Sequence, residues 1–128
     1  MKLLLDTHIW VWFRGDPRRI GRRALEILKR EENELWLSPI STWEVLTLQQ
    51  KGKIDLPANV SAWVEQAIAG IKEALLTHEI ALASRQFPPD QHPSDRLIAA
   101  TALVMDLTLI TADERLLELT NIKVLANN

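Results

Sequence analysis

The chain has 128 residues, of which 47% are hydrophobic and 25% are charged, and its formal net charge is -2. These proportions are typical of a globular domain, so the composition excludes a disordered chain, a collagen-like repeat and a disulfide scaffold. The absence of cysteine also excludes thiol catalysis, zinc knuckles and iron–sulfur clusters, which leaves carboxylates and three histidines as candidate metal ligands.

A chain of this length is expected to form a single domain over residues 1–128. No apolar run approaches the roughly 20 residues of a membrane span, and Asp6 interrupts the N-terminal apolar run before a signal-peptide core can form. We therefore expect a soluble, cytoplasmic protein with no membrane partner. Because the net charge is slightly negative, attraction to nucleic acid has to come from local basic patches.

The first part of the chain predicts a buried strand followed by two helices. Leu3–Leu5 is an apolar run that ends at Asp6, which is typical of a buried strand entering a turn. A helix should begin near His8 and stop before Pro17. The next helix is predicted over residues 18–30 and is amphipathic. Its outer face carries Arg18, Arg19, Arg22, Arg23, Lys29 and Arg30.

The middle of the chain predicts a second strand and two further helices. The second strand covers residues 35–38. Ser41 and Glu44 have the spacing of a capping box, in which a serine and a glutamate satisfy the free N–H groups at a helix start. The helix that they begin should run to residues 51–52, and another is expected over residues 60–70.

The rest of the chain alternates strands with helices. Strands are predicted over residues 73–77, 107–111 and 122–125, and helices over residues 78–87, 95–105 and 114–119. Five short strands separated by helices indicate a Rossmann-like, three-layer α/β sandwich with a mostly parallel five-stranded sheet. Ligands of such sheets bind just beyond the carboxyl ends of the strands.

Four carboxylates are predicted at or near that edge. Asp6 follows the first strand, Asp113 lies two residues beyond the strand ending at Thr111, and Glu44 follows the second strand. Asp95 opens the apolar helix and joins the others if that helix starts at the same crevice. Each acid alone is explained by helix capping or by the helix dipole. Four acids together would repel one another and raise their pKa values, so a divalent ion such as Mg²⁺ or Mn²⁺ would stabilise them.

The four acids lie in segments that together resemble the ordered motifs of PIN-domain nucleases, most closely the VapC-type toxins of bacterial toxin–antitoxin pairs. The segments are Leu3-Leu4-Leu5-Asp6-Thr7-His8, Ile40-Ser41-Thr42-Trp43-Glu44-Val45, Ser94-Asp95-Arg96-Leu97-Ile98-Ala99-Ala100 and Leu109-Ile110-Thr111-Ala112-Asp113. The resemblance covers essentially the whole chain. It implies a PIN-like nuclease domain and a Mg²⁺- or Mn²⁺-dependent endoribonuclease that hydrolyses RNA with metal-activated water. It also implies a cognate antitoxin protein that silences the enzyme, and a homodimer.

The resemblance assigns the family's acidic site residues to Asp6, Glu44, Asp95 and Asp113. Of these, Asp6 and Asp95 are expected to be the principal metal ligands. The hydroxyls of Thr7 and Thr111 are expected to orient a carboxylate or the attacking water. Related toxins often carry an additional aspartate before the proline where this chain has His92. His92 is therefore a candidate phosphate contact or weak ligand, against the alternative of a solvated loop histidine.

Basic and aromatic side chains supply candidate contact surfaces. The candidate RNA contacts are Arg18, Arg19, Arg22, Arg23, His92 and Arg96, against the alternative of a solvated helix face. Trp10, Trp12 and Phe13 are predicted to offer an antitoxin or dimer surface, because three large rings within four residues cannot all face inward from one helix. Trp36, Trp43 and Trp63 are predicted to lie in the core.

Two other functions remain open at this point. One is a phosphatase that forms an aspartyl-phosphate at Asp6, although the haloacid dehalogenase type places a second aspartate where this chain has His8. The other is a non-catalytic binding module with the same fold and an idle acidic pocket. Metal-dependent RNA cleavage separates the nuclease from both.

Overall fold

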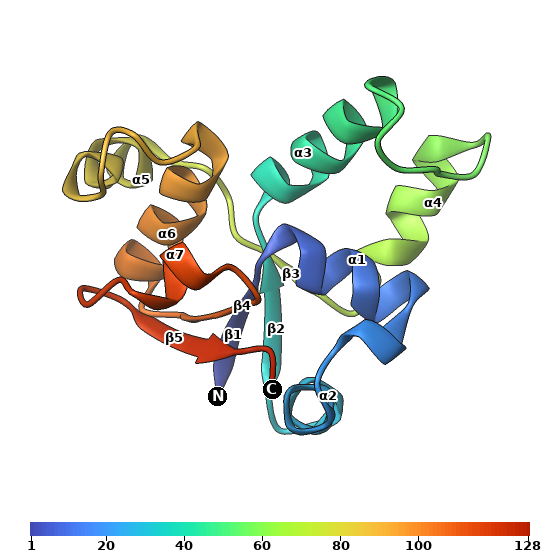
Figure 1. The fold of residues 1–128 in the computed structure, drawn as a ribbon, viewed down its shortest axis with the longest axis horizontal. Helices are drawn as coiled ribbons and strands as arrows, with labels where there is room; N and C mark the ends of the chain where they lie inside the picture. The colour runs from blue at the N-terminus through green and yellow to red at the C-terminus, as the bar shows by residue number, and fades with distance from the viewer.

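Five parallel strands form one sheet in the order β3-β2-β1-β4-β5 in the computed structural model, which describes residues 1–128 (Figure 1). The strands are β1 (Lys2–Leu5), β2 (Glu34–Leu37), β3 (Lys72–Glu73), β4 (Thr108–Thr111) and β5 (Lys123–Ala126). The predicted α/β fold with five parallel strands is therefore confirmed. Because neighbouring strands run parallel, each connection must return the chain from the carboxyl end of one strand to the amino end of the next.

Helices cover both faces of the sheet (Figure 1). They are α1 (Thr7–Gly15), α2 (Arg22–Lys29), α3 (Pro39–Gln50), α4 (Val60–Ala67), α5 (His78–Ala83), α6 (Pro93–Met105) and α7 (Glu114–Leu117), with short 3-10 turns η1 (Pro17–Arg19) and η2 (Ser84–Gln86). None of the helices is both long and apolar enough to span a membrane.

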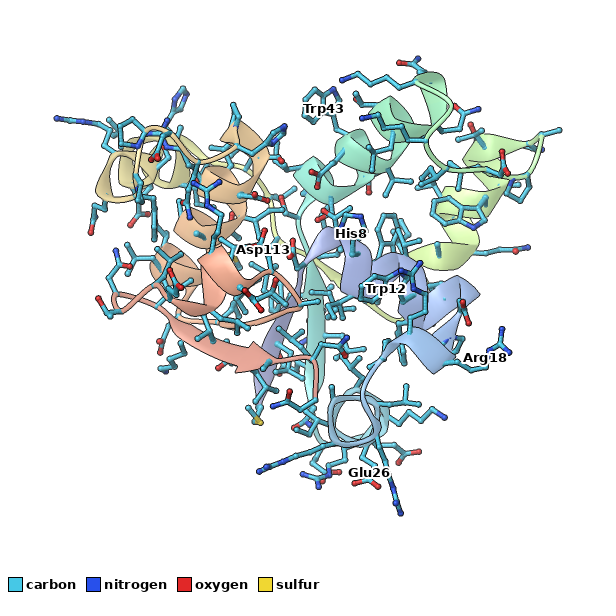
Figure 2. All side chains as sticks on the ribbon, viewed as in Figure 1. His8, Trp12, Arg18, Glu26, Trp43 and Asp113 are labelled. Atoms are coloured by element: carbon cyan, nitrogen blue, oxygen red, sulfur yellow. The ribbon has the colours of Figure 1, made fainter.

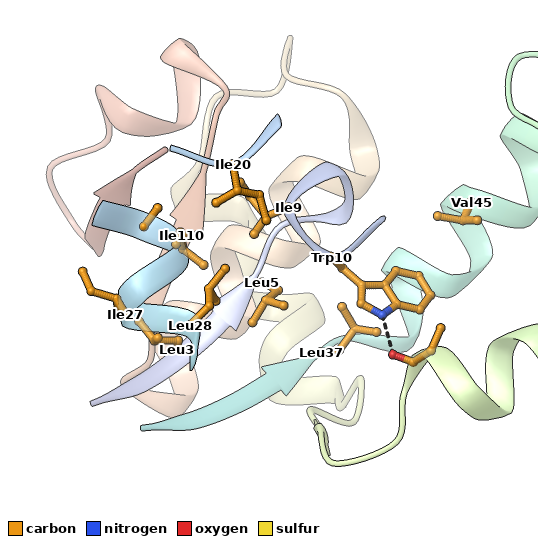
Figure 3. Packing of buried hydrophobic residues seen from close by; sticks show 12 residues of the cluster. Leu3, Leu5, Ile9, Trp10, Ile20, Ile27, Leu28, Leu37, Val45 and Ile110 are labelled. Carbon is orange, nitrogen blue, oxygen red and sulfur yellow. Dashed lines mark hydrogen bonds between the residues drawn. The ribbon is translucent and has the colours of Figure 1, made fainter. Parts of the chain in front are cut away.

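The alternation of side chains along β1 divides the core into two clusters. Leu3 and Leu5 point to one face, where they join residues of α1, α2, α3 and α4 (Figure 3). Leu4 points to the other face and joins residues of α5, α6 and α7. All three leucines are fully buried, as expected for a central parallel strand covered on both sides. The carboxyl end of β1 is thereby held rigidly in the middle of the molecule.

The predicted helix over residues 18–30 is wrong as a single element. The chain forms η1, then passes through extended Ile20, and starts α2 only after Gly21. The break is filled by the end of the chain: Asn127 Oδ1 accepts a hydrogen bond from the Gly21 N–H, and the Asn128 carbonyl accepts one from Ala24. A Cβ at Gly21 would lie 1.9 Å from the Asn128 carbonyl carbon, so only glycine fits there.

The predicted third strand over residues 73–77 is also wrong beyond its first residue. Strand β3 pairs only with Trp36 and Leu37 of β2. Past Leu37 the neighbouring strand turns into α3, whose first residue, Pro39, has no N–H to offer. The sheet therefore provides no partner for the residues after Ala74, and the exposed Leu75 and Leu76 leave its edge.

The start of helix α3 differs from the predicted capping box. Helix α3 begins at Pro39 with Ser38 as its N-cap, so Ser41 lies inside the helix and Glu44 does not complete a box with it. Helix α7 is capped by Asp113, whose carboxylate accepts from the Arg115 N–H at 2.8 Å. In both helices the N-cap is a serine or an aspartate directly before the helix, and its side-chain oxygen accepts from an N–H group of the first turn.

Two tryptophans have the opposite environment from the one predicted. Trp10 is fully buried, and its indole N–H donates to the carbonyl of Ala67 at 2.9 Å, so it cannot belong to a contact surface (Figure 3). Trp43 is 56% exposed instead of lying in the core. Trp36 and Trp63 pack against the core as predicted, and Trp12 and Phe13 are half-buried.

Candidate active site

The carboxyl end of β1 places Asp6 at the centre of the candidate site. One carboxylate oxygen accepts from the Thr7 N–H at 2.8 Å and so caps α1. The other accepts from the Thr111 hydroxyl at 2.5 Å. Strands β1 and β4 are neighbours, so their carboxyl ends bring Asp6 and Thr111 together although 105 positions separate them. Asp6 is only 7% exposed, and both oxygens are held in place.

A pocket of about 540 Å³ opens at this edge of the sheet. It is lined by Asp6, His8, Trp12, Arg19, Glu44, His92, Asp95, Ala112 and Asp113. All four sequence-predicted carboxylates therefore line one pocket: Asp6, Asp95 and Asp113 come from helix starts, and Glu44 comes from the second turn of α3. In Figure 2 the labelled His8, Trp12 and Asp113 fall near the centre of the molecule, whereas Arg18 and Glu26 lie at its periphery.

Asp95 reaches the pocket from the first turn of α6. It does not cap that helix, although capping was one explanation that the sequence offered for this residue. The N-cap is His92, whose ring nitrogen Nδ1 accepts from the Ser94 N–H at 3.3 Å. Helix α6 begins with Pro93, which pre-sets the first helical turn. With the cap taken by His92, the carboxylate of Asp95 is left for the pocket.

The electrostatics of the pocket penalise negative charge. Burial, followed by the charges of Asp6, Glu44 and Asp113, raises the pKa of Asp95 to about 6. Burial also raises the pKa of Asp6, although hydrogen bonds from Thr111 and Thr7 act in the opposite direction. Gathering these groups costs stability in the absence of a cation.

The donor set fits a hard divalent cation. All four acids supply carboxylate oxygens, which Mg²⁺ and Mn²⁺ prefer, and their mutual repulsion is what a bound cation would relieve. No three His, Asp or Glu side chains already stand together as a metal-binding group. Mg²⁺ does not require one, because it typically takes one or two carboxylates and keeps water in its other positions.

Hydroxyl side chains next to the pocket donate hydrogen bonds to two of the acids. Ser94 Oγ donates to Glu44 Oε2 at 3.0 Å and lies 2.7 Å from Nδ1 of His92. Thr7 donates to Ser41 at 3.0 Å, so its hydroxyl ties α1 to α3 instead of orienting a pocket carboxylate. The Thr111 hydroxyl donates to the Asp6 carboxylate.

The sequence analysis gives no site role to His8, which lines the pocket, or to Ser94, which donates to Glu44, and it places Ser41 in a different contact. The sequence predicts Ser41 in a capping box, whereas its buried hydroxyl accepts a hydrogen bond from Thr7. Ser94 stands directly before a candidate ligand at a helix start, and His8 stands two residues after Asp6. Their positions beside the acids were the available signal.

Only some of the predicted RNA contacts lie at the acidic pocket. Arg19 and His92 line the pocket. Arg18 pairs with Asp16 at 3.3 Å, and Arg22 approaches Glu26 at 3.8 Å on the outer face of α2. Arg23 lines a separate hollow beside β5. Arg96 turns inward and donates to the Ser84 carbonyl at 3.2 Å, so it does not line the acidic pocket.

Replacing Asp95 by asparagine is expected to stabilise the ion-free protein in a pH-dependent way. Since the folded chain holds this proton more tightly than the unfolded chain, stability falls as pH rises from about 3.8 to about 6, and the full penalty remains above that range. Asp95→Asn should therefore raise Tm by about 3–6 °C at pH 8, or about 1 kcal/mol after solvent screening, and change it little at pH 4.

Differential scanning calorimetry in EDTA at both pH values measures this effect. The control is Asp106→Asn, an exposed aspartate outside the pocket whose left-handed backbone suits asparagine. Equal Tm changes at pH 4 and pH 8 for Asp95→Asn would contradict the explanation that burial and the neighbouring charges penalise the ionised carboxylate.

Comparison with known proteins agrees with this fold. The family model described as PIN domain matches residues 3–122. Ribonuclease VapC22 of Mycobacterium tuberculosis is 31% identical over 118 residues, which cover 89% of this chain and 88% of that protein.

Solved structures share the fold at lower identity. In the VapBC2 structure of Rickettsia felis, bound to a promoter DNA fragment, the matched chain has a TM-score of 0.75 and 17% identity, with full coverage of both chains. The DNA-bound VapBC of Salmonella typhimurium gives 0.71 and 21%, with 98% coverage of each. The family model and the 31% identical relative both span most of the sequence. The chain therefore belongs to the PIN domain family and is homologous to the VapC ribonuclease toxins.

Proposed function

We propose that this chain is a Mg²⁺- or Mn²⁺-dependent endoribonuclease that acts as the toxin of a toxin–antitoxin pair. The observation that carries the proposal is the convergence of Asp6, Glu44, Asp95 and Asp113 on one pocket, where burial and then the charges of the other three acids raise the pKa of Asp95. A fold that keeps such a costly cluster benefits when a cation binds it. The 31% identical relative, a ribonuclease by name, supports the same chemistry.

The residues of the pocket have separate tasks in this proposal. Asp6 and Asp95 would be the principal ligands of the ion, with Asp113 and Glu44 completing the acidic pocket. When bound, the ion supplies a Lewis acid that activates water and neutralises charge developing on a phosphodiester. Thr111 fixes the orientation of Asp6 through its hydroxyl, and Ser94 does the same for Glu44.

A direct test uses the purified chain and a single-stranded RNA. We expect internal cleavage in millimolar Mg²⁺ or Mn²⁺ and none in EDTA, read on a denaturing gel with end-labelled RNA. Cleavage that continues in EDTA would exclude the metal-dependent mechanism. Ion binding without any cleavage would support the binding module, and phosphate release from a small phosphomonoester would support the phosphatase.

Mg²⁺ is expected to raise the Tm of the protein. An ion that binds only the folded chain stabilises it by about 1.4 kcal/mol at ten times its Kd, which corresponds to a few degrees. The shift should be largely lost in Asp6→Asn and kept in the control variant Asp106→Asn. Thermal unfolding at several Mg²⁺ concentrations measures it, and an undiminished shift in Asp6→Asn would argue against Asp6 as a ligand.

The partner that we propose is an antitoxin protein. Its support comes from the structural relatives, which include a toxin–antitoxin complex of Klebsiella pneumoniae with a TM-score of 0.65. Expression of the chain alone should arrest growth, and co-expression with the protein encoded beside it should relieve the arrest. No arrest in either case would contradict the toxin assignment. The homodimer and the single domain over residues 1–128 stay predictions.

A further inference from the structure

One wall of the acidic pocket is basic and aromatic. Arg19 lies with its guanidinium carbon 4.7 Å from the centre of the Trp12 ring. The ring of His8 lies 5.8 Å from the same ring, tilted by 49°. All three side chains line the pocket together with the four carboxylates. We call His8, Trp12 and Arg19 the basic wall.

Arg19 is the one lining residue of this pocket with a permanent positive charge. It is exposed, and it forms no ion pair with any carboxylate of the chain. Its neighbour Arg18 differs, because it pairs with Asp16 and lies outside the pocket. The donors of Arg19 therefore remain available to a ligand that enters the pocket.

The backbone of Arg19 is held by contacts far away in the sequence. Arg19 ends η1, and its carbonyl accepts from the side-chain amide of Asn127 at 3.0 Å. The next residue, Ile20, is buried in the core beneath. The Trp12 ring then limits where the guanidinium lies. Arg19 is thus pre-positioned, which reduces the entropy lost when it binds a ligand.

The chemistry of the basic wall matches a single-stranded polynucleotide. A guanidinium presents two parallel N–H groups to a phosphate, and unpaired bases stack on aromatic rings or on guanidinium planes. An RNA approaching four carboxylates needs a nearby positive charge to offset repulsion. The basic face of α2 is less suitable, because α2 lies at the end of the sheet where the strands begin, away from the pocket (Figure 1).

We propose that Arg19, seated on Trp12, positions single-stranded RNA at the acidic pocket by binding the phosphate of a nucleotide next to the cleaved bond, while the ring of His8 faces a base. This role rests on the proposed ribonuclease function. It makes Arg19 a positioning residue and gives the enzyme its preference for unpaired RNA, since a base in a duplex cannot reach the wall.

Steady-state cleavage of a single-stranded RNA oligonucleotide in Mg²⁺ tests the proposal. We expect Arg19→Ala to raise KM at least tenfold while kcat changes less than threefold, and Arg19→Lys to recover part of the loss. Arg18→Ala is the matched control, since it removes the same charge from the same turn outside the pocket, and it should leave KM within twofold. Trp12→Leu, which removes the aromatic ring that contacts the Arg19 guanidinium, should raise KM as well, and Trp12→Phe should raise it less.

A readout that a merely structural role would not move is the salt dependence. The slope of log KM against log salt should fall by about 0.7 in Arg19→Ala, as expected for one lost phosphate contact on a single strand, and stay unchanged in Arg18→Ala. The Tm of Arg19→Ala should match that of the parent protein. Equal KM values for Arg19→Ala and Arg18→Ala would overturn the proposal.

Two further outcomes are distinguishable. If the parent protein cuts no RNA, the proposed function fails. Fluorescence anisotropy of the same labelled RNA with Arg19→Ala and Arg18→Ala then tests RNA binding by the basic wall independently of cleavage. Equal affinities of the two variants for the RNA would overturn the proposed role of Arg19. If Arg19→Ala keeps its KM but escapes inhibition by the co-expressed neighbouring protein, the wall belongs to the antitoxin interface, which also overturns the RNA assignment.

Discussion

Asp6→Asn is expected to lower the rate of RNA cleavage on the order of 10³-fold at saturating Mg²⁺, because it removes the most deeply held charge of the pocket. The fold should survive. The asparagine carbonyl oxygen can still accept from the Thr7 N–H, and its amide can donate to the Thr111 hydroxyl, which now accepts instead of donating. Single-turnover cleavage of an end-labelled RNA measures the rate.

The comparison with Asp106→Asn separates loss of a ligand from a general change of charge. Asp106 carries the same functional group, is exposed, and lines a different hollow. Its replacement should leave the cleavage rate within twofold. Undiminished cleavage by purified Asp6→Asn, or by the double variant Asp6→Asn with Asp95→Asn, would refute the assignment of the acidic pocket as the active site.

Trp10→Ala is expected to lower the free energy of unfolding by about 3–5 kcal/mol. Trp10 is fully buried, joins the cluster around Leu3 and Leu5, and packs against Trp63 with ring centres 5.4 Å apart (Figure 3). Removing the ring leaves a cavity between α1 and α4. The Ala67 carbonyl keeps a partner, because Arg14 also donates to it at 2.9 Å, so the loss comes mainly from packing.

Urea unfolding followed by circular dichroism measures the loss. The matched control is Trp43→Ala, since Trp43 is the same residue type at 56% exposure, and its replacement should change the free energy of unfolding by about 0.5 kcal/mol or less. Trp10→Phe should lose less than Trp10→Ala, because it keeps most of the buried ring. A larger loss for Trp43→Ala than for Trp10→Ala would contradict the packing described here.

The sequence was sufficient to identify which acids follow the predicted strands and so belong to the candidate site. Asp6 and Asp113 follow recognisable strands, and the carboxyl ends of parallel strands share an edge. That rule could not place Asp95, which reaches the pocket from the first turn of α6. Its place depends on how α6 packs, and the N-cap His92 and the bond from Ser94 to Glu44 fix that start.

The aromatic residues were the least predictable. A count of rings on one helix indicated that some must be exposed, but it did not say which. Trp10 is buried because α4 lies against α1 and accepts its N–H. Trp43 is exposed because it faces the hollow between α3 and α4, where it meets no further layer. Both outcomes depend on helices that are distant in the sequence.

The sequence by itself determined the sheet and the choice of acids, because short apolar runs and the residues that follow them are local signals. Tertiary structure alone decided where the sheet ends, where residues 18–30 break, and which side chains surround the acids. The physical reason is that these features depend on contacts between residues far apart in the sequence. A strand needs a partner with free N–H and C=O groups, Gly21 meets the end of the chain, and the bond between Asp6 and Thr111 spans 105 positions.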